Sequence, residues 1–138
     1  MKDYTSLSEI QADLRDGKIS CVELVEHYIK RIDEKTNLNA FLEVFSETAR
    51  AQAKEVDAKI AGKKSGLATE ASAKVGKLAG MVIALKDNIC YKNHKVSASS
   101  KILEGFVSPY SSTVVERLLA EDAIIIGRTN CDEFAMGS

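Results

Sequence analysis

Apolar positions recur with helical spacing along the first third of the chain. Ser6 is followed by Glu9, and Ser20 by Glu23, the spacing of a capping box in which two residues bind each other's backbone N–H groups. Gly17 follows the first of these segments and is typical of a helix C-terminus. The pattern therefore predicts a short helix that starts at Ser6 and ends near Gly17, and a second helix that starts at Ser20.

The second predicted helix carries an apolar stripe that must face a core. The stripe consists of Val22, Val25, Tyr28, Ile29 and Ile32. Residues 37–39 break this helix, residues 40–44 read as a short extended run, and Ser46 opens a third predicted helix that reaches about Ala61.

Residues 62–77 change in composition to Lys, Ser, Ala, Gly and Thr. Lysines accumulate here against a single acid, Glu70, which suggests a phosphate- or RNA-facing strip. Arginine and aromatic residues are absent from the stretch, however, so a flexible, solvated loop is favoured over a nucleic-acid contact.

The second half has the pattern of a β-α-β unit. Residues 81–85 and 123–126 are continuous apolar runs, which predict strands buried on both faces, the second ending at Gly127. Between them a helix is expected from Ser112 or Thr113, with Val114, Val115, Leu118 and Leu119 on one side. Such a unit has parallel strands. Its crossover is long and irregular before residue 112, and long irregular connections are often functional.

Composition narrows the class of protein. The chain has 138 residues, 45% of them apolar, and a net charge of −1, which excludes disorder and a strong field for nucleic acid or an anionic membrane. The cysteines, Cys21, Cys90 and Cys131, are too far apart for a readable zinc or disulfide framework. The N-terminus has no signal-peptide pattern and no apolar run is long enough for a membrane helix, so we expect a cytoplasmic protein.

Lys86 is the strongest candidate for chemistry. It ends the first apolar run, on the same strand face as Val82 and Ala84. Burial there would lower the lysine pKa, and ligands bind at the carboxyl ends of parallel strands, so a neutral base is one interpretation. The alternative is a lysine that extends into solvent or pairs with Asp87.

The other candidates have simpler explanations. His27 is expected on an exposed helix face and His94 in a polar turn. Cys90 is expected as a small buried filler, since no nearby His or Arg would lower its pKa. The serines at positions 97, 99, 100, 111 and 112 are expected first as helix caps, because none lies in a nucleophile-elbow sequence.

Five segments in order resemble the amidase signature enzymes. They are LAGMVIALKDN at 78–88, ASSKILEGF at 98–106, PY at 109–110, TVVERL at 113–118 and GRTNCDEFAMGS at 127–138. Within this family they are most similar to the glutaminase subunits of tRNA-dependent amidotransferases, and the two N-terminal helices look like that group's opening. The resemblance implies an α/β fold in which N-terminal helices precede part of a mixed, largely parallel sheet.

The resemblance also implies a mechanism. These enzymes use a serine nucleophile, a second serine preceded by a cis peptide bond, and a lysine, which Lys86 matches. The nucleophile releases ammonia from glutamine, and water hydrolyses the resulting ester. Ammonia would pass to the B subunit of a heterotrimer, which activates Glu-tRNA(Gln) with ATP and Mg²⁺, while a small C subunit wraps the complex. No cofactor or metal is expected in the glutaminase subunit that this chain resembles.

Departures from the family pattern limit this expectation. Val82 stands where many relatives have proline, and Asn93 replaces a turn glycine. The Gly/Ser-rich segment that supplies both serines is not in this sequence. We therefore expect residues 1–138 to be the N-terminal portion of one amidase domain: a helical segment 1–61, the loop 62–77 and the lysine-bearing segment 78–138. Another amidase, or a non-catalytic interaction module, remains an alternative.

Overall fold

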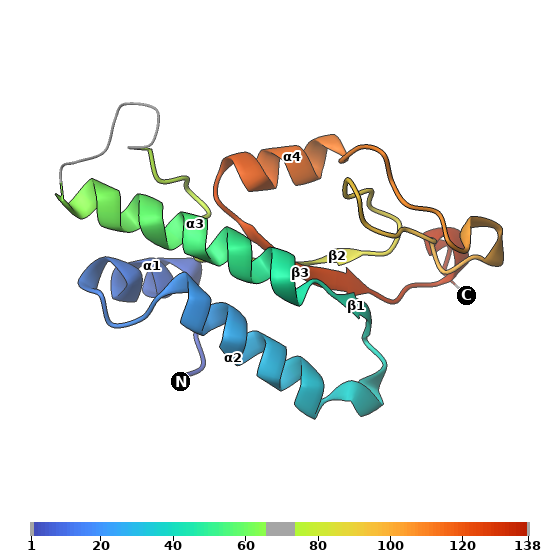
Figure 1. Cartoon of the computed structure of the whole chain (residues 1–138). Helices are drawn as coiled ribbons and strands as arrows, with labels where there is room; N and C mark the ends of the chain where they lie inside the picture. The colour runs from blue at the N-terminus through green and yellow to red at the C-terminus, as the bar shows by residue number, and fades with distance from the viewer. Residues whose placement is uncertain (1, 66–73, 138) are drawn as a thin grey trace.

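The computed structural model describes residues 2–65 and 74–137, which form an α/β fold with a mixed sheet (Figure 1). The helices are α1 (Leu7–Asp16), α2 (Cys21–Glu34), α3 (Ser46–Ser65) and α4 (Thr113–Ala120), and the short 3₁₀ helices are η1 (Thr36–Leu38), η2 (Lys101–Leu103) and η3 (Glu133–Ala135). The strands are β1 (Phe41–Val44), β2 (Val82–Lys86) and β3 (Ile124–Thr129). The predicted order of helices and strands is confirmed.

The two predicted capping boxes form to different degrees. Ser20 and Glu23 make both reciprocal bonds at the start of α2. At α1 the Ser6 hydroxyl accepts from the Glu9 N–H at 3.3 Å, but the Glu9 carboxylate accepts from the Thr5 N–H instead of that of Ser6. The first box is therefore half formed, and α1 still begins after Ser6 as predicted.

The sheet has the order β1-β3-β2, so the last strand lies in the middle. β2 and β3 are parallel, as the β-α-β pattern predicts, and β1 pairs antiparallel with β3. The prediction that the second strand ends at Gly127 is wrong, because β3 continues to Thr129. At Gly127 the neighbouring strand comes so close that an added Cβ would lie 2.5 Å from the Glu43 carbonyl oxygen. The glycine therefore permits strand pairing here and does not end it.

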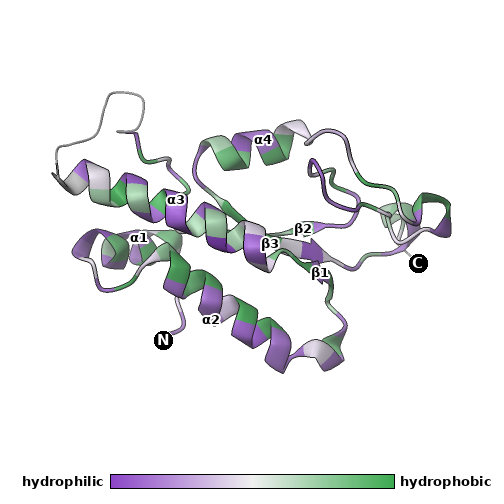
Figure 2. Ribbon diagram, viewed as in Figure 1, coloured by the Kyte–Doolittle hydropathy of each residue, from purple (hydrophilic) through white to green (hydrophobic). Residues whose placement is uncertain are grey.

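Helices cover both faces of the sheet. One core joins α1, α2 and α3 to β3, and includes Leu24, Val25, Ala53, Ile124 and Ile126. The other lies under α4 and consists of Phe45, Leu85, Tyr91, Val115 and Ile125. In Figure 2 the apolar residues of α1 and α2 lie on the side toward α3 and the sheet. Successive residues of β3 therefore alternate between the two cores.

Two burial predictions in the second half are wrong. β2 is not buried on both faces: Leu85 is buried, but Ala84 is exposed. Val82 and Ala84 line a cavity of about 590 Å³ beside the end of α2, because no described segment covers that part of the sheet. Val114 is half exposed and does not share the buried side of α4 with Val115.

Part of the predicted loop at 62–77 is helical. α3 continues through residue 65, and residues 66–73 lie outside the described part of the chain. At the far end, the N–H of Gly76 binds the Asp122 carboxylate and the N–H of Lys77 binds Glu121. Residues 76 and 77 are therefore fixed to the turn before β3.

Among the described residues, none of the helices combines the length and the apolar character that crossing a membrane requires.

Replacing Leu24 with Ala tests the core between α2 and the sheet. Leu24 is fully buried, and we expect Leu24→Ala to lower the free energy of unfolding by about 2–5 kcal/mol. Leu38→Ala is the matched control, because Leu38 is 65% exposed, and it should change stability by less than about 0.5 kcal/mol. Urea unfolding of both variants measures the difference, and equal losses would contradict the assigned core.

Candidate functional site

Lys86 is the last residue of β2 and pairs in register with Thr129 of β3. Its side chain is exposed, which agrees with the interpretation of a lysine that extends into solvent and not with that of a buried one. The pair with Asp87, the other form of that alternative, does not form. Within residues 2–65 and 74–137 the Lys86 ammonium makes no hydrogen bond or ion pair.

Asp87, directly after Lys86, is 1% exposed, and both of its carboxylate oxygens accept hydrogen bonds. Ser97 donates to it from its hydroxyl at 2.5 Å and from its backbone N–H at 3.2 Å. The Ser99 N–H donates at 3.0 Å, and Nη1 of Arg128 donates at 2.5 Å. This carboxylate therefore joins the end of β2 to the crossover loop and to β3.

Arg128 connects all three strands. It lies on the central strand β3, and its side chain is 13% exposed. One guanidinium nitrogen binds Asp87 after β2, and Nε binds the Glu43 carboxylate on β1 at 3.1 Å. Because the guanidinium is a planar fork of donors, one side chain can hold two carboxylates.

Opposing effects set the pKa of Asp87. Burial, the largest single effect, would raise it, because desolvation disfavours the charged carboxylate. The hydrogen bonds from Ser97, Ser99 and Arg128 together outweigh burial and hold the pKa below its usual range. Asp87 is therefore a stable anion.

The crossover loop and the segment after β3 meet in strained backbone. Ala98 and Ser99 have φ of 48° and 53°, and Phe134 and Ala135 have φ of 51° and 57°. The Phe134 N–H donates to the Ala98 carbonyl oxygen at 2.8 Å, so the two strained pairs contact each other. Positive φ in residues other than glycine costs free energy and clusters at functional sites.

Side chains reinforce that junction. The Ser99 hydroxyl lies 3.2 Å from Oδ1 of Asn130 and 3.4 Å from Sγ of Cys131. The Ser100 hydroxyl donates to Glu133 at 2.7 Å. The irregular crossover, which the sequence marks as a place for function, thus packs against the carboxyl end of β3.

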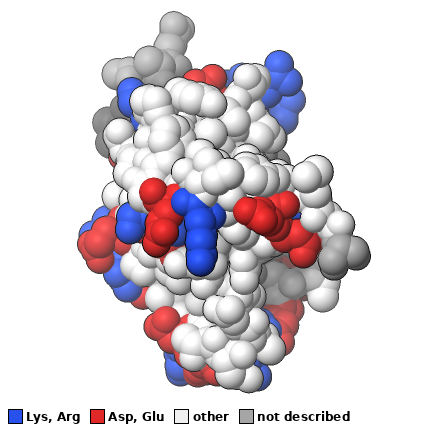
Figure 3. Space-filling view, turned by 90° about the vertical axis from the view of Figure 1, so that its right-hand side faces the viewer, with Lys and Arg blue, Asp and Glu red and all other residues white. Residues whose placement is uncertain are grey.

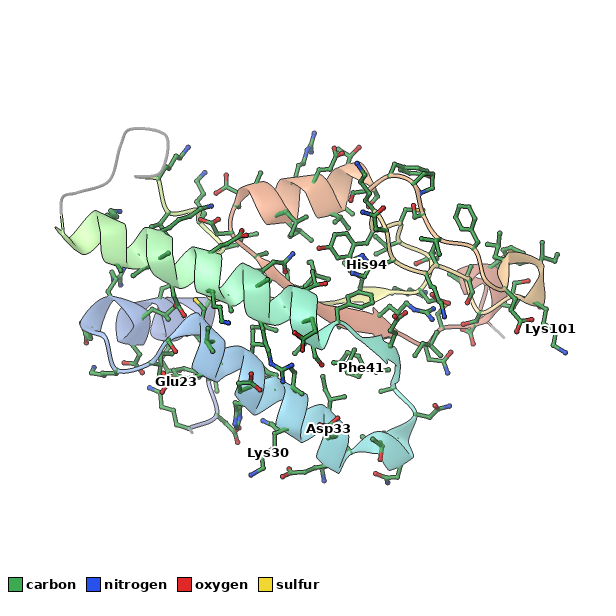
Figure 4. All side chains as sticks on the ribbon, in the orientation of Figure 1. Glu23, Lys30, Asp33, Phe41, His94 and Lys101 are labelled. Carbon is green, nitrogen blue, oxygen red and sulfur yellow. The ribbon has the colours of Figure 1, made fainter. Side chains whose placement is uncertain are left out.

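The weaker sequence candidates have structural roles. His94 stacks on Tyr91 with ring centroids 4.0 Å apart and contacts Phe45, and Figure 4 shows it below α4. His27 is half-buried on α2, so its predicted exposure is only partial. Cys90 is partly exposed, and its sulfur lies 3.6 Å from the Tyr110 hydroxyl.

Only some of the five serines act as helix caps, and the others make hydrogen bonds within the crossover loop. Ser100 caps η2 through its hydroxyl, as predicted. Ser112 precedes α4, but its hydroxyl makes no capping bond. Ser111 accepts from the Lys92 N–H. The cap prediction is wrong for Ser97 and Ser99, because the Ser97 hydroxyl donates to Asp87 and the Ser99 hydroxyl donates to Asn130.

The sequence patterns do not single out Arg128 or the role of Asp87. A signal was available, because both residues are charged and both lie at the carboxyl ends of strands predicted to be parallel neighbours. Their contact depends on the register of β2 against β3, in which Leu85 opposes Arg128. A bulge between Ile83 and Ala84 sets that register and has no marker in the sequence.

A cavity of about 490 Å³ lies beside the crossover loop, and its lining includes Ser97, Ser99, Arg128 and Asn130. Figure 4 shows Lys101 at the far tip of this loop. In Figure 3, which views the molecule from this end, basic and acidic side chains are interspersed and no field of one sign forms. Across the described residues, no three His, Cys, Asp or Glu side chains are grouped to hold a metal ion.

The chain that carries this site is similar to known proteins of one family. The chain matches the amidase family over residues 23–138. It is 44% identical over 135 residues to the A subunit of the glutamyl-tRNA(Gln) amidotransferase of Chlorobaculum parvum, covering 98% of this chain and 26% of that protein. It is 46% identical over 134 residues to the protein of the same name from Coxiella burnetii, covering 96% and 26%.

Solved structures agree with the sequence matches. The peptide amidase from Stenotrophomonas maltophilia superposes with a TM-score of 0.78 at 30% identity, covering 94% of this chain and 25% of that one. The chain therefore spans about a quarter of the length of the curated relatives, 26% in each of the two above.

Asp87→Asn tests the buried anion. At pH 7 we expect the variant to be less stable by about 3–5 kcal/mol, because it leaves Arg128 without its buried partner. The folded-state pKa of Asp87 is lowered, so the carboxylate stabilises the fold above its unfolded-state pKa of 3.8, and this contribution is lost as the pH falls through the folded-state value. The stability gap should therefore be constant from about pH 7 to 5 and narrow below about pH 4.

Urea unfolding at pH 7, 5 and 3 measures this gap. Asp33→Asn is the control, since it makes the same change of charge at an exposed residue of α2. A gap that does not change with pH would contradict an ionised Asp87 as the source of the stability.

Proposed function

The chain belongs to the amidase family, and we propose that it forms the lysine-bearing part of a glutamine-hydrolysing amidotransferase subunit. The observation that carries the proposal is the placement of Lys86. Its amine is exposed at the carboxyl end of β2, without a partner in the described residues, while its neighbour Asp87 is held by four hydrogen bonds. A proton acceptor needs an accessible amine that is not bound in an ion pair.

In the proposed reaction, neutral Lys86 accepts a proton from a bridging serine as that serine takes the proton of the nucleophilic serine. The nucleophile attacks the amide carbon of glutamine. As the C–N bond breaks, the nitrogen takes back a proton and leaves as ammonia, and a glutamyl ester remains. Water then cleaves the ester, which yields glutamate and restores the serine. Both serines would come from sequence outside residues 1–138.

The named relatives support the more specific form of the proposal. Identities of 44% and 46% over nearly all of this chain join it to two A subunits of glutamyl-tRNA(Gln) amidotransferases. On this basis the ammonia would pass to a B subunit that activates Glu-tRNA(Gln) with ATP and Mg²⁺, with a small C subunit as third partner. The complex would act in the cytoplasm.

A second candidate function is an amidase that acts on another small amide. The superposition on a peptide amidase at 30% identity supports it, since the same fold serves a different amide there. A third candidate is a non-catalytic interaction module, since residues 1–138 hold only one residue of the proposed catalytic set. Reading the gene past codon 138 separates the two enzymes from the module: a Gly/Ser-rich segment with both serines favours an enzyme, and a stop codon favours the module.

The 138-residue chain alone is expected to hydrolyse no glutamine, because both serines of the proposed mechanism are missing. Ammonia release measured with a coupled assay should equal the background without protein. Turnover by the chain that disappears in Lys86→Ala would contradict the proposal that both catalytic serines lie outside residues 1–138.

In the longer protein that the proposal requires, Lys86→Ala should lower kcat for ammonia release by at least about 10²–10⁴-fold, the usual contribution of a general base. The fold should be retained, because the Lys86 side chain is exposed. Lys30→Ala is the matched control: Lys30 is 78% exposed on α2, and Figure 4 shows it far from the end of β2. Full activity of Lys86→Ala would exclude Lys86 as the base.

A further inference from the structure

Arg128 faces Asp87 because β3 contains an extra residue. Ile125 lies in one core with Leu85. Arg128 follows Ile125 three residues later and faces the same side of the sheet, where it binds Asp87. In a regular strand, residues three apart point to opposite faces. The register against β2 skips Ile126, which is therefore the extra residue of a β-bulge.

The bulge determines which charged groups share a face of the sheet. Without the extra residue the pairing would slip by one position, and Arg128 would oppose Lys86 in place of Leu85. A slip of one residue moves a side chain to the other face. The guanidinium would then lie on the face of Lys86, and Asp87 would lose this partner. The arrangement at the end of β2 therefore depends on the register of β3.

Gln52, a half-buried residue of α3, holds the backbone at the bulge. Its Oε1 accepts a hydrogen bond from the Ile125 N–H at 2.9 Å. β1 pairs with residues 127–129 of β3, which follow Ile125, so a side chain of α3 takes the place of a neighbouring strand at this position. The Phe45 N–H, just before α3, donates to the Ile126 carbonyl oxygen at 2.8 Å. The segment after β1 thus binds the backbone of both residues.

The other end of the same amide reaches the crossover loop. Nε2 of Gln52 donates to the Tyr91 hydroxyl oxygen at 2.9 Å. Tyr91 is 9% exposed, and its ring stacks on that of His94. Both aromatic residues lie at the start of the loop that donates two backbone N–H groups to Asp87. One side chain therefore contacts both the strand and the loop that meet at Asp87.

We propose that Gln52 is a positioning residue: it fixes the bulge of β3 and the start of the crossover loop, and so keeps Arg128 on Asp87 and away from the face of Lys86. The purpose of this arrangement rests on the proposed function, in which Lys86 takes part in the reaction. The register itself is a property of the described residues and is measured without any activity.

Gln52→Met tests the role of the amide, because methionine has a similar length and lacks both hydrogen-bonding groups of the amide. In the 138-residue chain, the Ile125 N–H should exchange with solvent about 5- to 100-fold faster, the effect expected when a buried donor has no acceptor. The Ser97 and Ser99 N–H groups should also exchange faster, because they bind an Asp87 whose position is no longer fixed. The amides of α2 should be unchanged. Hydrogen exchange followed by NMR measures each of these rates.

Gln11→Met is the matched control, because Gln11 is also half-buried and its amide donates to the Lys77 carbonyl oxygen, a contact of α1. It should leave the exchange rates at the bulge and in the crossover loop unchanged. Gln52→Glu keeps an oxygen that can accept from the Ile125 N–H and from the Tyr91 hydroxyl. It should therefore have the wild-type exchange rates.

Faster exchange at Ile125 alone, or equally faster exchange at all amides, would overturn the proposal, because the amide would then have only a local or a general structural role. If Gln52→Met does not fold, Tyr91→Phe decides, since it removes only the hydroxyl that Gln52 binds. It should speed exchange at Ser97 and Ser99 and leave Ile125 protected, and unchanged rates at both serines would overturn the proposal.

Kinetics in the longer protein that the proposed function requires give a second readout. Gln52→Met should lower kcat for ammonia release by about 10²-fold and leave KM for glutamine unchanged, because misplacing a catalytic group by about 1 Å has an effect of this size. An unchanged kcat would contradict a positioning role. If the longer protein releases no ammonia even without the substitution, the proposed function is contradicted, and the exchange rates still decide the role of Gln52.

Discussion

The ion pair between Asp87 and Arg128 is the contact on which this end of the molecule depends. It links β2 to β3 directly, reaches β1 through Glu43, and fixes the crossover loop through the N–H groups of Ser97 and Ser99. A buried carboxylate cannot be left without partners, so the loop must bring its donors to Asp87 even at the cost of positive φ at Ala98 and Ser99. The irregular loop is thus determined by one charge at a strand end.

The strong periodic patterns predicted the elements well, because local spacing and capping residues determine them. Ser20 with Glu23 begins α2 as expected, and the parallel pairing of β2 and β3 follows from the crossover between them. The sequence does not reveal features that depend on contacts between distant segments of the chain. Gly127 continues a strand because β1 lies against it, and Ala84 is exposed because no described segment covers it.

The sequence predicts one residue of the candidate site, Lys86, but not the residues around it. The sequence indicates Lys86 from its place at the end of an apolar run but leaves a buried and a solvent-exposed lysine open, and the structure has it exposed. Arg128 was missed because its role depends on a register that a bulge defines. The structure thus changes the account of Lys86. Its amine is exposed, and its acidic neighbour Asp87 is bound by Ser97, Ser99 and Arg128.

We propose that this chain supplies the lysine-bearing quarter of an amidase. A hybrid tests it most directly, in which residues 1–138 replace the matching segment of the 44%-identical protein from Chlorobaculum parvum. Ammonia release from glutamine is then measured for the hybrid and for the hybrid with Lys86→Ala. The account predicts activity in the first and its loss in the second. A folded hybrid without activity, or one that keeps its activity after the Lys86 substitution, would contradict it.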